Sequence, residues 1–94
     1  MTWKKFQNHS RFHGISVRPT TIMITASAYR ELNKPTELGI EFDKEQKLIR
    51  FTIKDEFKVK NLAGNYINCS LGKIMPCGRY ALENGIFKLI EIIK

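Results

Sequence analysis

The sequence predicts an α+β protein, mostly β, in which a small antiparallel sheet curves into a barrel-like shape beside one or two short helices. Apolar and polar residues alternate over most of the chain, which is the pattern of half-buried strands. Turn-forming residues separate these runs at short intervals. The order of the runs in residues 15–53 recurs, with weaker signals, in residues 57–93. We therefore predict a duplicated ββαββ unit.

The first unit contains four predicted strands and one helix. Thr25 is the predicted N-cap of the helix, because its hydroxyl can accept a hydrogen bond from an otherwise unpaired N–H. Pro35 is expected to end the helix, and a helix of two turns must pack on the sheet to be stable. The predicted elements are the strands Ile15–Arg18 and Ile22–Thr25, the helix Ala26–Asn33, and the strands Leu38–Phe42 and Lys47–Ile53.

Charged residues in the last two of these strands are expected to pair with each other. In an antiparallel hairpin Glu37 and Glu41 would lie opposite Arg50 and Lys54, an arrangement that stabilises sheets. This hairpin is therefore the part of the chain least expected to bind an anion.

The second unit repeats the order of elements. Ser70 is expected to cap a helical turn, and Asn84-Gly85 predicts a type I′ hairpin. The segment Lys54-Asp55-Glu56 is expected to join the two units. The last strand is apolar on both faces, as in a central strand or one buried in a dimer. The predicted elements are the strands Phe57–Lys60 and Tyr66–Cys69, the turn Ser70–Met75, and the strands Arg79–Leu82 and Ile86–Ile93.

Length and composition fit one folded domain at residues 15–94, preceded by an N-terminal arm at residues 1–14. The chain has 94 residues, of which 43% are hydrophobic. We expect no membrane span, because apolar runs are short, and no secretion, because the N-terminus lacks an apolar signal segment. Two cysteines are too few for a disulfide framework, so a cytoplasmic protein with reduced thiols is expected.

The net charge of +7 is unevenly distributed along the chain. Residues 1–30 hold five basic side chains and no acidic one, and residues 57–82 hold four basic side chains and no acidic one. Two acid-free blocks would suit a surface that faces a polyanion, provided that the fold brings them together. The alternative is that these cations only keep the protein soluble.

The N-terminal arm interleaves aromatic and basic residues. Trp3, Phe6 and Phe12 alternate with cations, and such a mixture can stack on bases while it neutralises phosphates. The alternative is that these rings pack the arm onto the core. We predict a nucleic-acid-binding surface, with DNA expected more than RNA, formed by Trp3, Lys4, Lys5, Arg11, Arg18, Lys58, Lys60 and Arg79.

No catalytic or cofactor-binding motif is evident in the sequence. Nucleophilic catalysis needs a nucleophile beside an oriented base, and both histidines lie in the arm. A zinc site can be drawn from the four residues His9, His13, Cys69 and Cys77, but it lacks the short Cys-x₂₋₄-Cys spacing. We therefore predict a non-enzymatic protein with no metal and no cofactor.

The first unit resembles the swapped-hairpin unit of AbrB-type transition-state regulators and MazE-type antitoxins. The resemblance rests on Ile15-Ser16-Val17-Arg18, Ile22-Met23-Ile24-Thr25, the helix end Glu31-Leu32, and Leu38-Gly39-Ile40-Glu41-Phe42. It implies a barrel of two interleaved units, or a related double-psi barrel, with a basic face that binds DNA. Arg18 alone is carried over as a cation of that face, because Thr20-Thr21 and Ala26 stand where the family has Gly-Arg and Pro.

Other features leave a protein partner open. The chain is short, basic and rich in lysine and isoleucine, and it has the segment Gly78-Arg79-Tyr80 before a final hairpin. In these features it resembles small proteins of bacteriophages and mobile elements. An exposed strand edge at Phe57–Lys60 or Ile86–Ile93 could bind a partner strand. The alternative function is therefore a protein-binding module, which acts as an inhibitor or an adaptor of a host protein and could itself form a homodimer.

Overall fold

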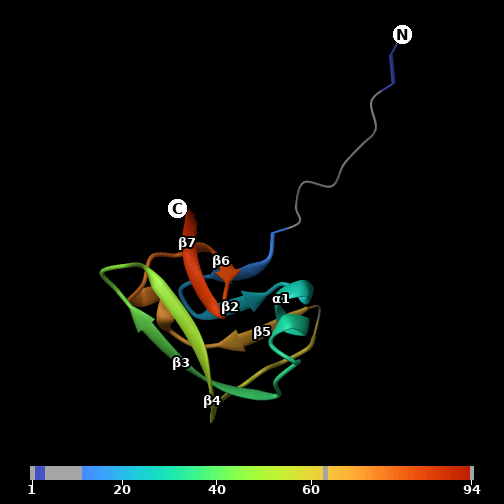
Figure 1. The fold of residues 1–94 in the computed structure, drawn as a ribbon. Helices are drawn as coiled ribbons and strands as arrows, with labels where there is room; N and C mark the ends of the chain where they lie inside the picture. Colours follow the sequence, from blue (N-terminus) through green and yellow to red (C-terminus); the bar gives the residue numbers. More distant parts are fainter. Residues whose placement is uncertain (1, 4–11, 63, 94) are drawn as a thin grey trace.

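The computed structural model describes residues 2–3, 12–62 and 64–93 (Figure 1). The described chain forms a mostly β fold, in which seven antiparallel strands make one sheet that curves into a half-barrel. The elements in chain order are β1 (Gly14–Val17), β2 (Thr21–Ile24), α1 (Ala26–Glu31), β3 (Glu37–Asp43), β4 (Leu48–Lys58), β5 (Asn65–Asn68), the 3-10 turn η1 (Leu71–Lys73), β6 (Gly78–Glu83) and β7 (Ile86–Ile92).

The order of the strands across the sheet is β3-β4-β7-β6-β1-β2-β5. The hairpins β1–β2, β3–β4 and β6–β7 join strands that are neighbours in both sequence and space. β1 and β6 form a ladder between distant parts of the chain, as do β2 and β5. No helix among the described residues has the length and apolar character needed to cross a membrane.

The core lies on the concave side of the sheet and follows the period of two expected for strands. Tyr80 and Phe87 are the largest fully buried side chains. The Tyr80 hydroxyl donates to the Pro76 carbonyl oxygen at 2.7 Å, so this buried polar group is satisfied. The Phe87 ring packs against Phe51, with ring centroids 4.8 Å apart. The aliphatic residues of the core include Ile15, Val17, Ile22, Ile24, Leu38, Ile49, Ile67 and Leu82.

The predicted separation of Lys47–Ile53 from Phe57–Lys60 is wrong. Phe57 and Lys58 are the end of β4, and both parts of β4 pair with β3. Gly39 pairs with Thr52 while Leu38 pairs with Phe57, so four residues of β4 are inserted between these two pairs. The charged run in this insertion suggested a junction between units, whereas it is an exposed irregularity within one strand.

Two predicted details of the charge pairing and capping are also wrong. Glu41 pairs with Arg50 as predicted, but Glu37 pairs with Lys58 instead of Lys54, because the insertion shifts the register. Ser70 makes no side-chain hydrogen bond at the start of η1. A turn of three residues exposes few N–H groups that need such a cap.

The predicted cap of α1 and the predicted type I′ hairpin are confirmed, whereas the helix is shorter than predicted. The Thr25 hydroxyl accepts a hydrogen bond from Ala28 N at 3.3 Å and caps α1. The helix ends at Glu31, two residues earlier than predicted, because Asn33 adopts a φ of 64°. Asn84 and Gly85 both have positive φ, at 53° and 79°, as a type I′ hairpin requires.

The last strand, β7, is central in the sheet as predicted, with β4 on one side and β6 on the other. Its ladder with β4 contains only the pairs Leu48–Lys88 and Ile49–Phe87. Beyond this ladder Ile90 and Ile92 are more than half exposed. A central position therefore does not bury the C-terminal part of this strand.

Candidate nucleic-acid interface

The strand order brings the two acid-free blocks of the sequence together. β1 and β2 come from the first block, and their outer neighbours β6 and β5 come from the second. These four adjacent strands contain one acidic residue, Glu83, which is the last residue of β6. The strands β3, β4 and β7 carry six acidic residues. We call β6, β1, β2 and β5 the acid-free half of the sheet, because Glu83 at the end of β6 is their single acidic residue, and we call β3, β4 and β7 the acidic half.

A transverse line of side chains crosses the convex side of the acid-free half. The alternation of burial places these side chains opposite the buried rows that contain Ile15 and Val17. We call this line the outer row. It consists of Arg79, Ser16, Met23, Tyr66 and Lys60, each of which faces the next across a ladder or bridge.

The outer row carries a cation at each end and uncharged side chains between them. Four steps of the usual strand spacing separate Arg79 from Lys60, or about 19 Å along the sheet. Both cations are exposed, whereas Ser16, Met23 and Tyr66 are half-buried. The predicted basic face is therefore not a continuous row of cations, since an uncharged strip divides it.

An aromatic residue of the arm lies at the Arg79 end of this row. The Arg79 guanidinium carbon is 5.6 Å from the centre of the Phe12 ring, a distance at which cation–π attraction operates. The Phe12 ring also covers Gly14, where an added Cβ would come within 3.0 Å of the ring. Phe12 therefore packs on the sheet and holds the Arg79 side chain beside it.

The predicted residue Arg18 lies at the turn between β1 and β2, next to the outer row. Its N–H donates to the Thr21 carbonyl oxygen at 2.8 Å, and its side chain is exposed. Gly72 of η1 touches the backbone of this turn: a Cβ on Gly72 would lie 2.2 Å from the Arg18 oxygen. The contact brings Lys73, an exposed cation in η1, into the neighbourhood of Arg18.

Lys58 and Lys60 point outward, while Phe57 and Val59 pack against the core. Lys58 faces Glu37 across the sheet, so its charge is partly offset. The predicted edge at Phe57–Lys60 is occupied in part. Phe57 and Lys58 pair with β3, the Val59 N–H donates to the Thr36 carbonyl oxygen, and Lys60 forms a bridge with Tyr66. The bridge to Tyr66 is what places Lys60 in the outer row.

The predicted contributions of the arm are only partly described. Trp3 is 87% exposed, so its ring is open to solvent. The predicted residues Lys4, Lys5 and Arg11 lie outside the described residues, and so does Phe6.

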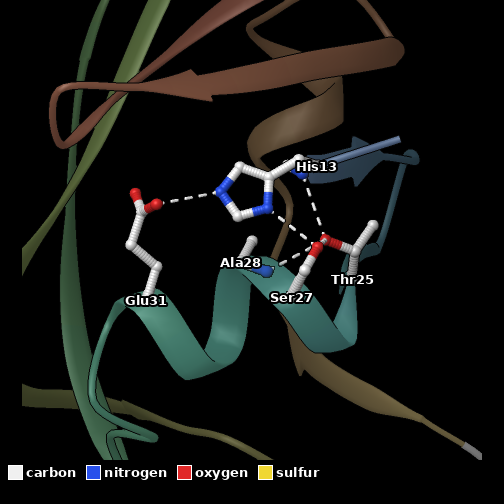
Figure 2. Close-up of polar contacts among 6 residues, drawn as sticks. His13, Thr25, Ser27, Ala28 and Glu31 are labelled. Carbon is white, nitrogen blue, oxygen red and sulfur yellow. Dashed lines mark hydrogen bonds and ion pairs between the residues drawn. The ribbon is translucent and has the colours of Figure 1, made fainter. Parts of the chain in front are cut away.

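A polar cluster fixes the point where the arm enters the sheet (Figure 2). The His13 ring lies between two residues of α1, with Nδ1 2.8 Å from Ser27 Oγ and Nε2 3.1 Å from Glu31 Oε1. The Thr25 hydroxyl accepts from the N–H groups of both Gly14 and Ala28, at 3.1 and 3.3 Å. His13 is thus held by the helix, as an anchor for the arm.

The chain of contacts from Ser27 through His13 to Glu31 has the composition of a catalytic triad. Such a site also needs a recess for the substrate and donors for the developing oxyanion. One groove of about 560 Å³ lies elsewhere, near Phe42, Ile49 and Ile86 at the end of the β3–β4 hairpin. We interpret the cluster as an anchor for the arm and keep a non-enzymatic function as our prediction.

The two thiols lie beside the acid-free half without forming a ligand cluster. Burial raises the pKa of the Cys69 thiol, and a backbone hydrogen bond from Leu71 partly opposes this effect. The Cys77 thiol donates to the Gly72 carbonyl oxygen at 3.4 Å. Within residues 2–3, 12–62 and 64–93, no three possible metal ligands come together.

The sequence prediction omitted Tyr66 and Lys73 from the candidate surface. It placed Phe12 in the arm but did not predict its contact with Arg79. The period-two pattern of β5 already placed Tyr66 outward, opposite Ile67. Its position beside Lys60 and Met23 follows only from the strand order. No family model, curated protein or solved structure matches the chain.

Proposed function

We propose that the protein binds nucleic acid, without catalysis, through phosphate contacts on the acid-free half of the sheet. The observation that carries this proposal is the union of two acid-free segments, distant in sequence, in the four strands β6, β1, β2 and β5. Arg18, Lys60 and Arg79 are exposed on or beside these strands. The two ion pairs between described residues, Glu41–Arg50 and His13–Glu31, engage none of these three cations.

Contacts with phosphates suit this architecture better than base readout by a helix. A helix that reads bases must enter the major groove, and α1 has only six residues, two of them buried. Exposed lysine and arginine side chains at the rim of a sheet can instead neutralise phosphates of any sequence. The proposal therefore expects binding with little sequence preference and a strong dependence on salt.

Charge reversal at one end of the surface tests the proposal. Replacing Lys58 and Lys60 by Glu should weaken oligonucleotide binding at least tenfold, because it removes two cations and adds two anions. The matched control, K44E/K47E, changes the net charge equally in the β3–β4 hairpin and should bind like the wild type, apart from a small general effect of net charge. Both variants should melt near the wild-type temperature. Equal affinities of the two double variants would contradict the proposal.

A protein-binding role is the second candidate, and one observation favours it. The ladder between β4 and β7 stops after Leu48–Lys88, where β4 begins, and the remaining part of β7 exposes Ile90 and Ile92. A strand edge with apolar side chains can accept a strand from a partner or from a second copy. Sedimentation of the wild type and of I92K tests self-association: a dimer that I92K converts to a monomer would support this role, and a wild-type monomer would exclude the homodimer.

The duplicated ββαββ unit also remains a proposal. Strands at equivalent places in the two predicted units pair with each other, β2 with β5 and β4 with β7. The ladder between β1 and β6 likewise has a counterpart in the pairing of β3 with Phe57 and Lys58. If the halves are equivalent, a chain of residues 14–53 should form a homodimer with these ladders. A chain that stays monomeric and unfolded would count against the duplication.

A further inference from the structure

We propose that the nucleic acid bound here is single-stranded and lies across the outer row, with bases stacked at both of its ends. One end is Tyr66 beside Lys60, and the other is the Phe12–Arg79 pair. This inference rests on the proposed function and specifies its ligand.

Each end of the row combines a flat side chain with a cation. Tyr66 is half-buried and faces Lys60 directly across the bridge between β5 and the segment after β4. Phe12 is likewise half-buried, and the Arg79 guanidinium lies 5.6 Å from its ring centre. Aromatic rings and guanidinium planes are the groups on which unpaired bases stack, and the cations can hold the neighbouring phosphates.

The middle of the row also fits a single strand better than a duplex. Ser16 and Met23 carry no charge, so this strip offers surface for bases and sugars where a continuous phosphate track would need cations. In a duplex the base faces are stacked on one another, and neither Tyr66 nor Phe12 could reach them. The separation of the two ends is about 19 Å. A stacked strand advances about 3.4 Å per nucleotide, so the row would span about six nucleotides.

Leucine variants separate stacking from charge. Y66L removes the ring and keeps an apolar side chain opposite Met23, and F12L does the same over Gly14. The matched control is F42L, which removes a ring that is 45% exposed in the β3–β4 hairpin, away from the outer row. The experiment titrates each full-length variant against fluorescein-labelled 12-mers of single-stranded DNA, single-stranded RNA and duplex DNA at low salt.

The expected result is that single strands bind at least tenfold more tightly than the duplex. Y66L and F12L should each weaken single-strand binding about tenfold, since the loss of one stacked base has an effect of this order. F42L should bind like the wild type. The titrations with single-stranded DNA and single-stranded RNA show which sugar the surface prefers, and either preference supports a single-stranded ligand.

Because F12L could loosen the start of β1, cross-linking of the wild type provides an independent test. An oligonucleotide that contains 5-iodouracil should cross-link to the peptides with Phe12 or Tyr66, and duplex DNA should not. The inference is overturned if the duplex binds as tightly as the single strand, or if Y66L binds as tightly as F42L. In both of these cases the proposed function survives, whereas no binding of any oligonucleotide at low salt would remove the function as well.

Discussion

The hydroxyl oxygen of Thr25 lies 3.1 Å from the backbone nitrogen of Gly14 and accepts a hydrogen bond from it. The same oxygen accepts from Ala28 N at 3.3 Å, so one side chain caps α1 and also fixes the first residue of β1. Phe12 and His13 immediately precede that residue. The helix cap and the attachment of the arm therefore depend on one another.

Replacing Thr25 by Ala should lower the free energy of unfolding by about 1–2 kcal/mol, because both N–H groups lose their acceptor. T25S keeps the oxygen and should stay within about 0.5 kcal/mol of the wild type. Urea denaturation followed by circular dichroism measures both values. A T25A variant as stable as T25S would show that the shared hydroxyl does not stabilise this junction.

Gly72 should tolerate no side chain, because a Cβ there would lie 2.2 Å from the Arg18 carbonyl oxygen. G72A must push η1 away from the β1–β2 turn, and we expect a loss of about 1–3 kcal/mol from this overpacking. S70A provides the control, since the Ser70 side chain makes no capping hydrogen bond. Thermal unfolding should separate the two variants clearly. Equal melting temperatures of G72A and S70A would mean that the β1–β2 turn and η1 can move apart without loss of stability.

Tyr80 should make stability depend on alkaline pH. Burial, with a smaller effect from nearby Cys77, raises the pKa of Tyr80 to about 12, against 10.0 for an ordinary tyrosine. The unfolded chain loses this proton first, so the stabilisation is complete below pH 10 and is lost as the pH rises from 10 to 12. The loss amounts to about 2–3 kcal/mol for a shift of this size.

The variant Y80F is the control for this pH dependence. It should be less stable than the wild type at pH 8 by about 1–3 kcal/mol, because the Pro76 carbonyl loses its donor. Between pH 8 and pH 11.5 the wild type should lose the stabilisation that depends on the Tyr80 proton, and Y80F has no such proton to lose. The unfolding free energies of the wild type and of Y80F should therefore become more similar as the pH rises. Urea unfolding at both pH values measures this difference. If the difference in unfolding free energy between the wild type and Y80F is the same at pH 8 and at pH 11.5, Tyr80 does not destabilise the fold by titrating between these pH values.

Local sequence patterns predicted much of the fold. The period of two placed Ile15, Val17, Tyr80 and Leu82 in the core, and Asn84-Gly85 identified the hairpin before β7. These features depend on interactions between near neighbours in the chain. The four-residue insertion in β4 was missed, because its charged residues have the composition of a turn and only the pairing with β3 makes them part of a strand.

The candidate surface was less predictable than the fold. Charge counting identified the two acid-free blocks, but their union depends on the ladders β1–β6 and β2–β5, which local patterns do not specify. The same ladders place Tyr66 beside Met23, and a contact in space joins Phe12 to Arg79. The anchoring of His13 by Ser27 and Glu31 likewise joins residues 14 and 18 positions apart.

The most direct test of the central claim is a titration of the wild-type protein with fluorescein-labelled oligonucleotides at 50 mM and at 200 mM salt, with anisotropy and Trp3 emission recorded together. If Arg18, Lys58, Lys60 and Arg79 each neutralise one phosphate, single-strand affinity should fall about 50-fold between about 50 and 200 mM salt. Quenching of Trp3 by single strands would add the arm to the interface. Absence of binding at 50 mM salt, or an affinity that does not change with salt, would contradict the account.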